Sequence, residues 1–336
     1  MPAIAIIILT ALSVCGQQSG DAYATAIARL RQAPGDGRMF EEARAAGFDA
    51  VGRGLYAQAL EVFDAALVVR RDDALTLYGR ALALFNLRRT DEAMAAADQA
   101  VDRAVAGIAV EGGRRSAANA LTLRAVILAV GGRTADSVID LRRAIGYDPD
   151  NFDAHFSLGR ALYGMRDMGA AARSFEEAVR LRPADVGARF FLATSLERNG
   201  ELDAALASYR ELVRLAPGRA EGHLGVGALL VRRGGKDEAE GAASLSRAIE
   251  LNGELYEARI ALGRTLVRQG RAEEAVEHLK AAARLSPENP EPHYQLAMAY
   301  RKLGRRAESA AEFREVQRIN DERRKKGKVG SMSDPQ

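Results

Sequence analysis

The sequence predicts an all-α protein built from stacked helix-turn-helix repeats, and three observations lead to that prediction. The segment "HFSLGRALY", which begins at His155, returns in related form at Arg189, Arg259 and His293. The first two starts are 34 residues apart, as are the last two, and a fixed period of this length is typical of repeat architectures. The composition is rich in Ala, Leu and Arg and holds no Trp, which favours helix. Glycine and proline recur in the period at places where helices end.

Stacked repeats also account for the length of the chain. A single hydrophobic core of 336 residues would exceed the size at which proteins usually divide into domains. Repeats avoid that limit because each one buries its apolar face only against its neighbours.

The chain begins with an apolar leader. Twelve apolar or small residues run from Ala3 to Val14. This run is shorter than the roughly 18 residues that span a bilayer, but it has the length of a signal-peptide apolar region. The overlapping "LSVC", Leu12 to Cys15, resembles the lipobox of bacterial lipoproteins, although Val14 replaces the usual small residue and no basic side chain precedes the run. Residues 1–20 are predicted to be a signal or lipoprotein leader and tether, lipidated at Cys15. An uncleaved leader or a misassigned start is the alternative.

Each repeat carries two helical faces, as residues 152–185 illustrate. Leu158, Gly159 and Leu162 are spaced at i, i+1 and i+4, so they share one face of a first helix. A second set at i, i+4 and i+7 marks one face of a second helix, which Pro183 ends. This second set consists of Ala171, Phe175 and Ala178.

Small residues are expected where the two helices of a repeat approach each other. Gly159 should face Ala171, while large side chains such as Phe175 fill the gap to the following repeat. Between the two helices, a glycine suits the left-handed conformation that ends a helix. The glycines at this place are Gly200, Gly234, Gly270 and Gly304.

The pattern resembles the tetratricopeptide repeat family in its 34-residue length, its Leu-Gly/Ala-x-x-Leu/Tyr first helix, its Ala-x-x-x-Phe/Tyr/Leu-x-x-Ala second helix and its terminal proline. The resemblance implies two antiparallel helices per repeat, stacked into a right-handed superhelical solenoid with a concave groove. An N-terminal helix or linker (21–39) precedes the predicted array (40–323), and a basic disordered tail (324–336) follows it. The eight predicted repeats are 40–73, 74–107, 118–151, 152–185, 186–219, 220–255, 256–289 and 290–323.

Three features depart from the family pattern. Residues 108–117 form an insertion, and we expect the second helix before it to run on beyond its usual end before a turn at Gly112-Gly113, which makes a local irregularity in the superhelix. The repeat 220–255 has two extra residues, which fit its internal turn. Arg80 and Arg124 stand where a leucine is expected.

Composition and motifs argue against an enzyme, a cofactor or metal site, and nucleic-acid binding. No glycine-rich phosphate loop and no Ser/His/Asp set stands out. His155, His223 and His293 occupy equivalent places two repeats apart, which is about 20 Å in a helix stack and too far for shared metal coordination. The net charge is +3, and the last fourteen residues alone carry +4, so the body of the chain is nearly neutral.

A second stripe on the first helices holds the candidate binding residues. It lies one residue after the core stripe, and the family resemblance implies that it lines the concave groove. Aromatic residues with interspersed arginines are the types that anchor peptides, although the same stripe could only pack first helix against first helix. Tyr78, Leu82 and Phe85 occupy it in repeat 74–107. The predicted partner-groove residues are Phe156, Arg160, Tyr163, Phe190, Arg264, Tyr294, Met298 and Arg301.

The sequence therefore predicts a non-enzymatic protein-binding scaffold that captures partner segments in its groove. Repeat lipoproteins that it resembles act in envelope assembly, so the expected place is the cell envelope, with a membrane anchor through lipid on Cys15. A cytoplasmic adaptor is one alternative. The other is a regulatory subunit that modulates an enzyme in trans.

Overall fold

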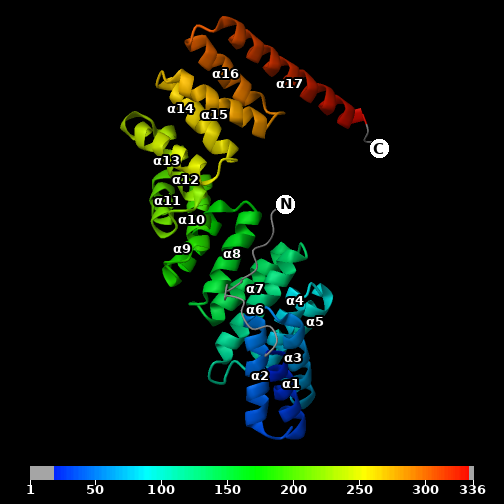
Figure 1. Ribbon diagram of the computed structural model, residues 1–336. Helices are drawn as coiled ribbons and strands as arrows, with labels where there is room; N and C mark the ends of the chain where they lie inside the picture. Colours follow the sequence, from blue (N-terminus) through cyan, green and yellow to red (C-terminus); the bar gives the residue numbers. More distant parts are fainter. Residues whose placement is uncertain (1–18, 333–336) are drawn as a thin grey trace. The chain divides into compact units, whose positions relative to one another are not determined.

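The computed structural model describes residues 19–332 and confirms the all-α repeat fold (Figure 1). Within those residues the chain forms seventeen α-helices and one short 3-10 turn, with no strand. It divides into two compact units, with the boundary between Pro183 and Ala184. Across residues 19–332, every helix is too short or too polar to traverse a lipid bilayer.

Helix α1 (Ser19–Gln32) opens the first unit, and four helix pairs follow it. These pairs are α2 (Gly37–Gly52) with α3 (Tyr56–Val69), α4 (Ala74–Asn86) with α5 (Thr90–Ala106), α6 (Gly113–Val130) with α7 (Thr134–Tyr147), and α8 (Phe152–Gly164) with α9 (Met168–Leu181).

The second unit contains four further pairs. They are α10 (Val186–Asn199) with α11 (Leu202–Leu215), α12 (Ala220–Arg233) with α13 (Glu238–Leu251), α14 (Tyr256–Arg268) with α15 (Ala272–Leu285), and α16 (Pro290–Lys302) with α17 (Arg306–Met332). The turn between α12 and α13 holds the 3-10 element Gly235–Asp237, so the two extra residues of this repeat lie where they are expected.

The first helices of successive repeats form an inner row. In the first unit α2 contacts α4, α4 contacts α6, and α6 contacts α8, whereas successive second helices of the described chain have no comparable contact. In the second unit α12 contacts α14, and α14 contacts α16. A stack whose first helices lie closer together than its second helices curves toward the first helices, so these helices line its concave side.

The core depends on one large side chain that fits against two small residues. A Cβ atom on Gly47 would lie 2.6 Å from the Phe63 ring, and one on Gly79, in the next repeat, would lie 2.4 Å from it. The expectation that small residues face small residues within a pair is therefore wrong in this detail. Several large residues of second helices pack on the glycine of their own first helix, as Phe175 does on Gly159 and Leu279 on Gly263, because a Cβ atom there would occupy the same space.

Basic side chains join successive repeats in the second unit. Arg268 at the end of α14 donates a hydrogen bond to the Val231 carbonyl of α12, at 3.3 Å, and pairs with Glu238 of α13. Lys302 at the end of α16 donates in the same way to the Val267 carbonyl of α14. A cation at a helix C-terminus is stabilised by the helix dipole. Here each cation contacts the C-terminal end of the first helix of the preceding repeat.

The insertion adds helix on both sides of its turn. Helix α5 has 17 residues, against 14 for α3, so it runs on as expected. Helix α6 begins at Gly113, so residues 113–117 are helical as well, and Gly112 supplies the left-handed residue before it with φ of 75°. Arg114 then donates hydrogen bonds to the carbonyls at the end of α7, which fastens the added turn of α6 to its own repeat.

Two predicted boundaries need correction. Helix α17 continues to Met332, so residues 324–332 are helical and not a disordered tail. Helix-favouring Arg, Lys and Glu residues extend it, and Arg318 pairs with Glu315 and Glu322 along its face. At the other end, α1 accounts for much of the segment predicted as a helix or linker, and it begins at Ser19, inside the predicted leader. The remainder of that leader, with Cys15, lies outside the described residues.

A residue with positive φ occurs at the same place in the turn of every repeat. Six of the eight residues are glycines, with φ between 73° and 88°, and the others are Arg88 and Arg166, with φ of 62° and 64°. A side chain in this conformation is strained because its Cβ crowds the backbone. The six glycines are Gly54, Gly132, Gly200, Gly234, Gly270 and Gly304.

Replacing Arg166 by glycine should stabilise the protein. The change removes roughly 1–2 kcal/mol of left-handed strain and loses roughly 0.5–1 kcal/mol through the greater freedom of glycine in the unfolded chain. Urea denaturation should show a net gain of up to about 1.5 kcal/mol in the free energy of unfolding. The matched control, Gly200→Arg, should lose stability. A loss of stability in Arg166→Gly would contradict the argument.

Candidate functional site

The candidate site lies on the inner row of first helices in the first unit. Residues spaced at i, i+4 and i+7 share a helix face, and α4 and α8 each present such a trio along this row. We name this surface the groove strip: Phe48 on α2; Tyr78, Leu82 and Phe85 on α4; Val126 on α6; and Phe156, Arg160 and Tyr163 on α8. All of these residues are half-buried except Arg160, which is exposed.

Two members of the strip are named nowhere in the sequence-based stripe or its list of groove residues. Phe48 and Val126 stand at the ninth residue of their repeats, the place that Leu82 and Arg160 occupy in theirs. The repeat register alone is enough to identify them. The sequence pattern does not single them out, because their repeats have no aromatic residues at the spacings at which Phe156 and Tyr163 flank Arg160 on α8.

Aromatic contacts hold the rings of the strip in place. The Phe48 ring lies 5.1 Å from Phe63, edge-on, and 6.3 Å from Tyr78, with 29° between the ring planes. On α8, the Phe156 ring stacks on Phe152 at 5.7 Å. Rings that are already fixed lose little conformational entropy when a partner covers them.

Tyr78 is a strip residue whose surroundings shift its ionisation. Burial, and then the nearby carboxylate of Asp153, raise the pKa of the Tyr78 phenol to about 12. The Asp153 carboxylate itself lies 3.8 Å from the guanidinium of Arg182. The phenol is therefore neutral at physiological pH, and Tyr78 adds apolar surface and a hydroxyl but no charge.

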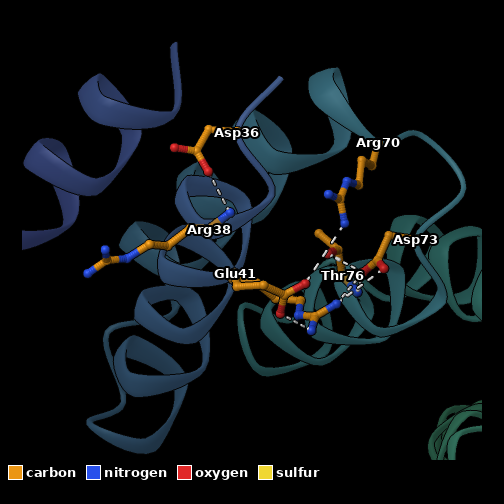
Figure 2. A network of polar contacts seen from close by, with 7 residues as sticks. Asp36, Arg38, Glu41, Arg70, Asp73 and Thr76 are labelled. Atoms are coloured by element: carbon orange, nitrogen blue, oxygen red, sulfur yellow. Dashed lines mark hydrogen bonds and ion pairs between the residues drawn. The ribbon is translucent and has the colours of Figure 1, made fainter. Parts of the chain in front are cut away.

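A polar network ties α2 to α4 beside the strip. Arg44 donates to both carboxylate oxygens of Asp73, at 3.2 Å each, and also pairs with Glu41. Figure 2 shows the contacts around this pair: Asp73 accepts from the Thr76 backbone N–H at 2.8 Å, which caps α4, and Arg70 lies 3.9 Å from Glu41. The Arg44 guanidinium is thus occupied by contacts within the protein.

The two unexpected arginines of the core stripe are also paired. Arg80 lies 2.6 Å from Asp64 of the preceding repeat, and Arg124 lies 3.1 Å from Asp98 of its own preceding repeat. Arg124 also binds both oxygens of Asp140, which is only 4% exposed. These hydrogen bonds raise the pKa of Arg124. The arginines replace a leucine because a carboxylate neutralises each of them, so they stabilise the stack and do not offer a free charge.

The eight predicted groove residues divide between the two units. Phe156, Arg160 and Tyr163 lie together on α8, while the other five belong to the second unit. There, Arg219 lies over the Phe190 ring at 5.0 Å, and Tyr294 is 43% exposed with its ring 6.1 Å from Phe313. The second unit also holds Arg264 and Arg301, both exposed, and Met298, which is half-buried.

The three histidines at equivalent places of the repeats take part in ordinary polar contacts. His155 is 8% exposed, and its Nε2 lies 2.9 Å from the Pro149 carbonyl oxygen. His223 makes the same contact with Pro217 at 3.0 Å. Nδ1 of His293 lies 2.6 Å from a carboxylate oxygen of Glu312. In the described part of the chain, no group of His, Cys, Asp and Glu has the arrangement of a metal site.

Solved structures of repeat proteins resemble this one. The C-terminal part of a TPR repeat-containing protein from Cytophaga hutchinsonii is 16% identical over 75% of this chain and 99% of its own, with a TM-score of 0.57. Pseudomonas aeruginosa pilF is 17% identical over 62% of this chain and 93% of its own, with a TM-score of 0.51. At these identities the likeness shows the fold alone. No curated protein sequence matches the chain.

Models of the tetratricopeptide repeat match most of the array. One matches residues 44–107, 122–185 and 156–220, and two others match 263–304 and 290–323. Together they cover more than half of the chain, and their segments fall on the helix pairs described above. Repeats of this kind form protein-interaction scaffolds that are generally non-enzymatic. The chain belongs to the tetratricopeptide repeat family.

Proposed function

We propose that this protein captures a segment of a partner protein on the groove strip of its first unit. The observation that carries the proposal is the continuity of half-buried apolar side chains across α2, α4, α6 and α8. A contiguous apolar surface of this kind marks an interaction site more often than scattered apolar residues do. Packing of first helix against first helix accounts for the buried part of these side chains and leaves their exposed part available.

The two units support the proposal unequally. In the first unit the strip is mostly aromatic and aliphatic. The polar residues at the same repeat places are Arg44, which pairs with Asp73, Thr122, which donates to the Ala118 carbonyl, and Arg160. In the second unit the corresponding places include Thr194, Glu197, Arg264 and Arg301. The partner segment is therefore expected to present apolar side chains to the first unit. A role for the five groove residues of the second unit stays a prediction.

A charge placed in the middle of the strip should abolish capture. Peptides selected from a random display library on the full-length protein should bind Leu82→Glu at least tenfold more weakly than wild type, because a buried anchor contributes about 2 kcal/mol or more. The control is Val68→Glu, on a residue of α3 that is 79% exposed, and it should bind normally. Unchanged binding by a folded Leu82→Glu protein, checked by circular dichroism, would place the peptide site elsewhere.

The raised pKa of Tyr78 predicts a loss of stability at alkaline pH. In the unfolded chain a tyrosine loses its proton near pH 10, whereas folded Tyr78 holds its proton up to about pH 12. The unfolded state is therefore favoured progressively as the pH rises from about 10 to 12, and below pH 10 the effect is absent. Between pH 9 and 11, urea denaturation should show that wild type loses about 1 kcal/mol more than Tyr78→Phe. Equal losses in the two proteins would contradict the assignment.

We also infer that the protein is exported, anchored by lipid on Cys15 and active in an envelope assembly complex. The apolar run and "LSVC" support this proposal, and both lie outside the described residues. The alternatives are a cytoplasmic adaptor and a regulatory subunit that acts on an enzyme in trans. Co-purification of an enzyme whose activity changes on binding would favour the last.

The anchor can be tested by replacing Cys15. Wild type should fractionate with membranes and carry a lipid-modified N-terminal cysteine by mass spectrometry, and Cys15→Ser should lose both properties. An intact Met1 or Pro2 terminus on soluble wild-type protein would exclude the anchor while leaving the groove proposal untouched.

A further inference from the structure

A cleft opens beside the strip where α6, α7 and α8 meet. Its volume is about 210 Å³. Helices α6 and α8 supply mainly small or aliphatic walls, and the first turn of α7 supplies hydroxyl groups. Arg160 is the charged residue of the lining. The lining residues are Val126, Ala129, Val130, Thr134, Ser137, Ser157, Arg160, Ala161 and Gly164.

The Arg160 guanidinium has no anionic partner in the described chain. No hydrogen bond or ion pair to it occurs within residues 19–332, in contrast to Arg44, Arg80 and Arg124, which are all neutralised. Although the residue is exposed overall, the protein around its head group removes water and lowers the pKa of Arg160. An arginine that is partly desolvated and unpaired gains more from an incoming anion than one that is already neutralised.

The first turn of α7 adds two further features that favour an anion. Its N-cap residue, Arg133, makes no side-chain capping hydrogen bond, so no side chain satisfies the free backbone N–H groups there. The one acidic residue of this turn, Asp136, is paired with Arg133 at 2.8 Å, so its negative charge is offset. Ser137 is 1% exposed, and its Oγ has no hydrogen-bond partner in the structure as described. A helix N-terminus and an unsatisfied hydroxyl both stabilise negative charge nearby.

We propose that this cleft is a subsite for one acidic side chain, Asp or Glu, of the partner segment. The inference rests on the proposed function and names the specificity of the same surface. The carboxylate would bind Arg160 through paired hydrogen bonds, while the aliphatic wall from Val126 to Val130 contacts its methylene groups. A single guanidinium matches the single charge of a carboxylate. A phosphate group, with a charge near −2, would call for a second cation, and the cleft lining supplies none.

Peptide selection tests the subsite without knowledge of the natural partner. Random dodecapeptides displayed on phage are selected on the full-length protein and on Arg160→Met. Wild type should enrich Asp or Glu at a constant distance from an apolar residue, and Arg160→Met should enrich the apolar residue alone. Arg173→Met is the matched control, because Arg173 is an exposed arginine on α9 of the same repeat and lies outside the strip. Selection on this variant should retain the acidic position.

A double-mutant cycle then assigns the contact. The best peptide and its Glu→Gln or Asp→Asn form are titrated by fluorescence anisotropy. The amide form should bind wild type about tenfold more weakly, as expected for a hydrogen bond to a charged group, and Arg160→Met should bind both forms alike. Peptides that bind through Leu82 but show no acidic preference, or an acidic preference that survives Arg160→Met, would overturn the subsite and leave the proposed function standing. If selection on the wild-type protein enriches no peptide at all, that result would instead overturn the proposed function. Tighter binding of a phosphoserine form than of the acidic form would show a phosphate subsite and also overturn the proposal.

Discussion

The stack depends on a single packing constraint: a bulky side chain on a second helix needs a glycine or another small residue on the first helices that it touches. The Phe63 ring occupies the space that a Cβ atom would take on both Gly47 and Gly79. Tyr209 fits against Gly225 of the following repeat in the same way. Because such a ring touches its own repeat and the next one, the contact sets the distance between repeats as well as the geometry within each. Packing of this density tolerates little added volume, so the small residue at this place of the first helix is a requirement of the fold.

This constraint also explains why so much of the fold could be predicted from the sequence. Size and polarity recur at fixed places in a 34-residue period, and contacts between neighbouring repeats are local in sequence. The pairs and their turns followed from that pattern, down to the left-handed glycines. The error about which residues face each other arose because the pattern records where small residues stand, but not which large residue reaches them. The prediction of a disordered tail is wrong because a run of charged residues continues a helix when opposite charges pair along its face, as Arg318 does with Glu315 and Glu322.

The candidate site was less accessible from the sequence, because pairing and exposure are three-dimensional properties. Arg44, Arg124 and Arg160 look alike in the sequence, and only the structure distinguishes the arginines held by carboxylates from the one that faces a cleft. Repeat register could have identified Phe48 and Val126. No sequence signal could have identified the cleft, since it requires α6, α7 and α8 to meet with an unsatisfied serine between them.

The insertion before α6 leaves an ion pair between its neighbouring repeats in place. Asp64 and Arg80 are 16 residues apart, whereas the equivalent pair, Asp98 and Arg124, is 26 residues apart, and both pairs still form. The ten additional residues are therefore absorbed by longer helices and by the turn at 107–112, where Val110 is 67% exposed. Exposed turns with few contacts accept added sequence well. This hairpin tip is thus a permissive point at which a fluorescent label, an epitope or a whole domain could be attached while every repeat keeps its neighbours.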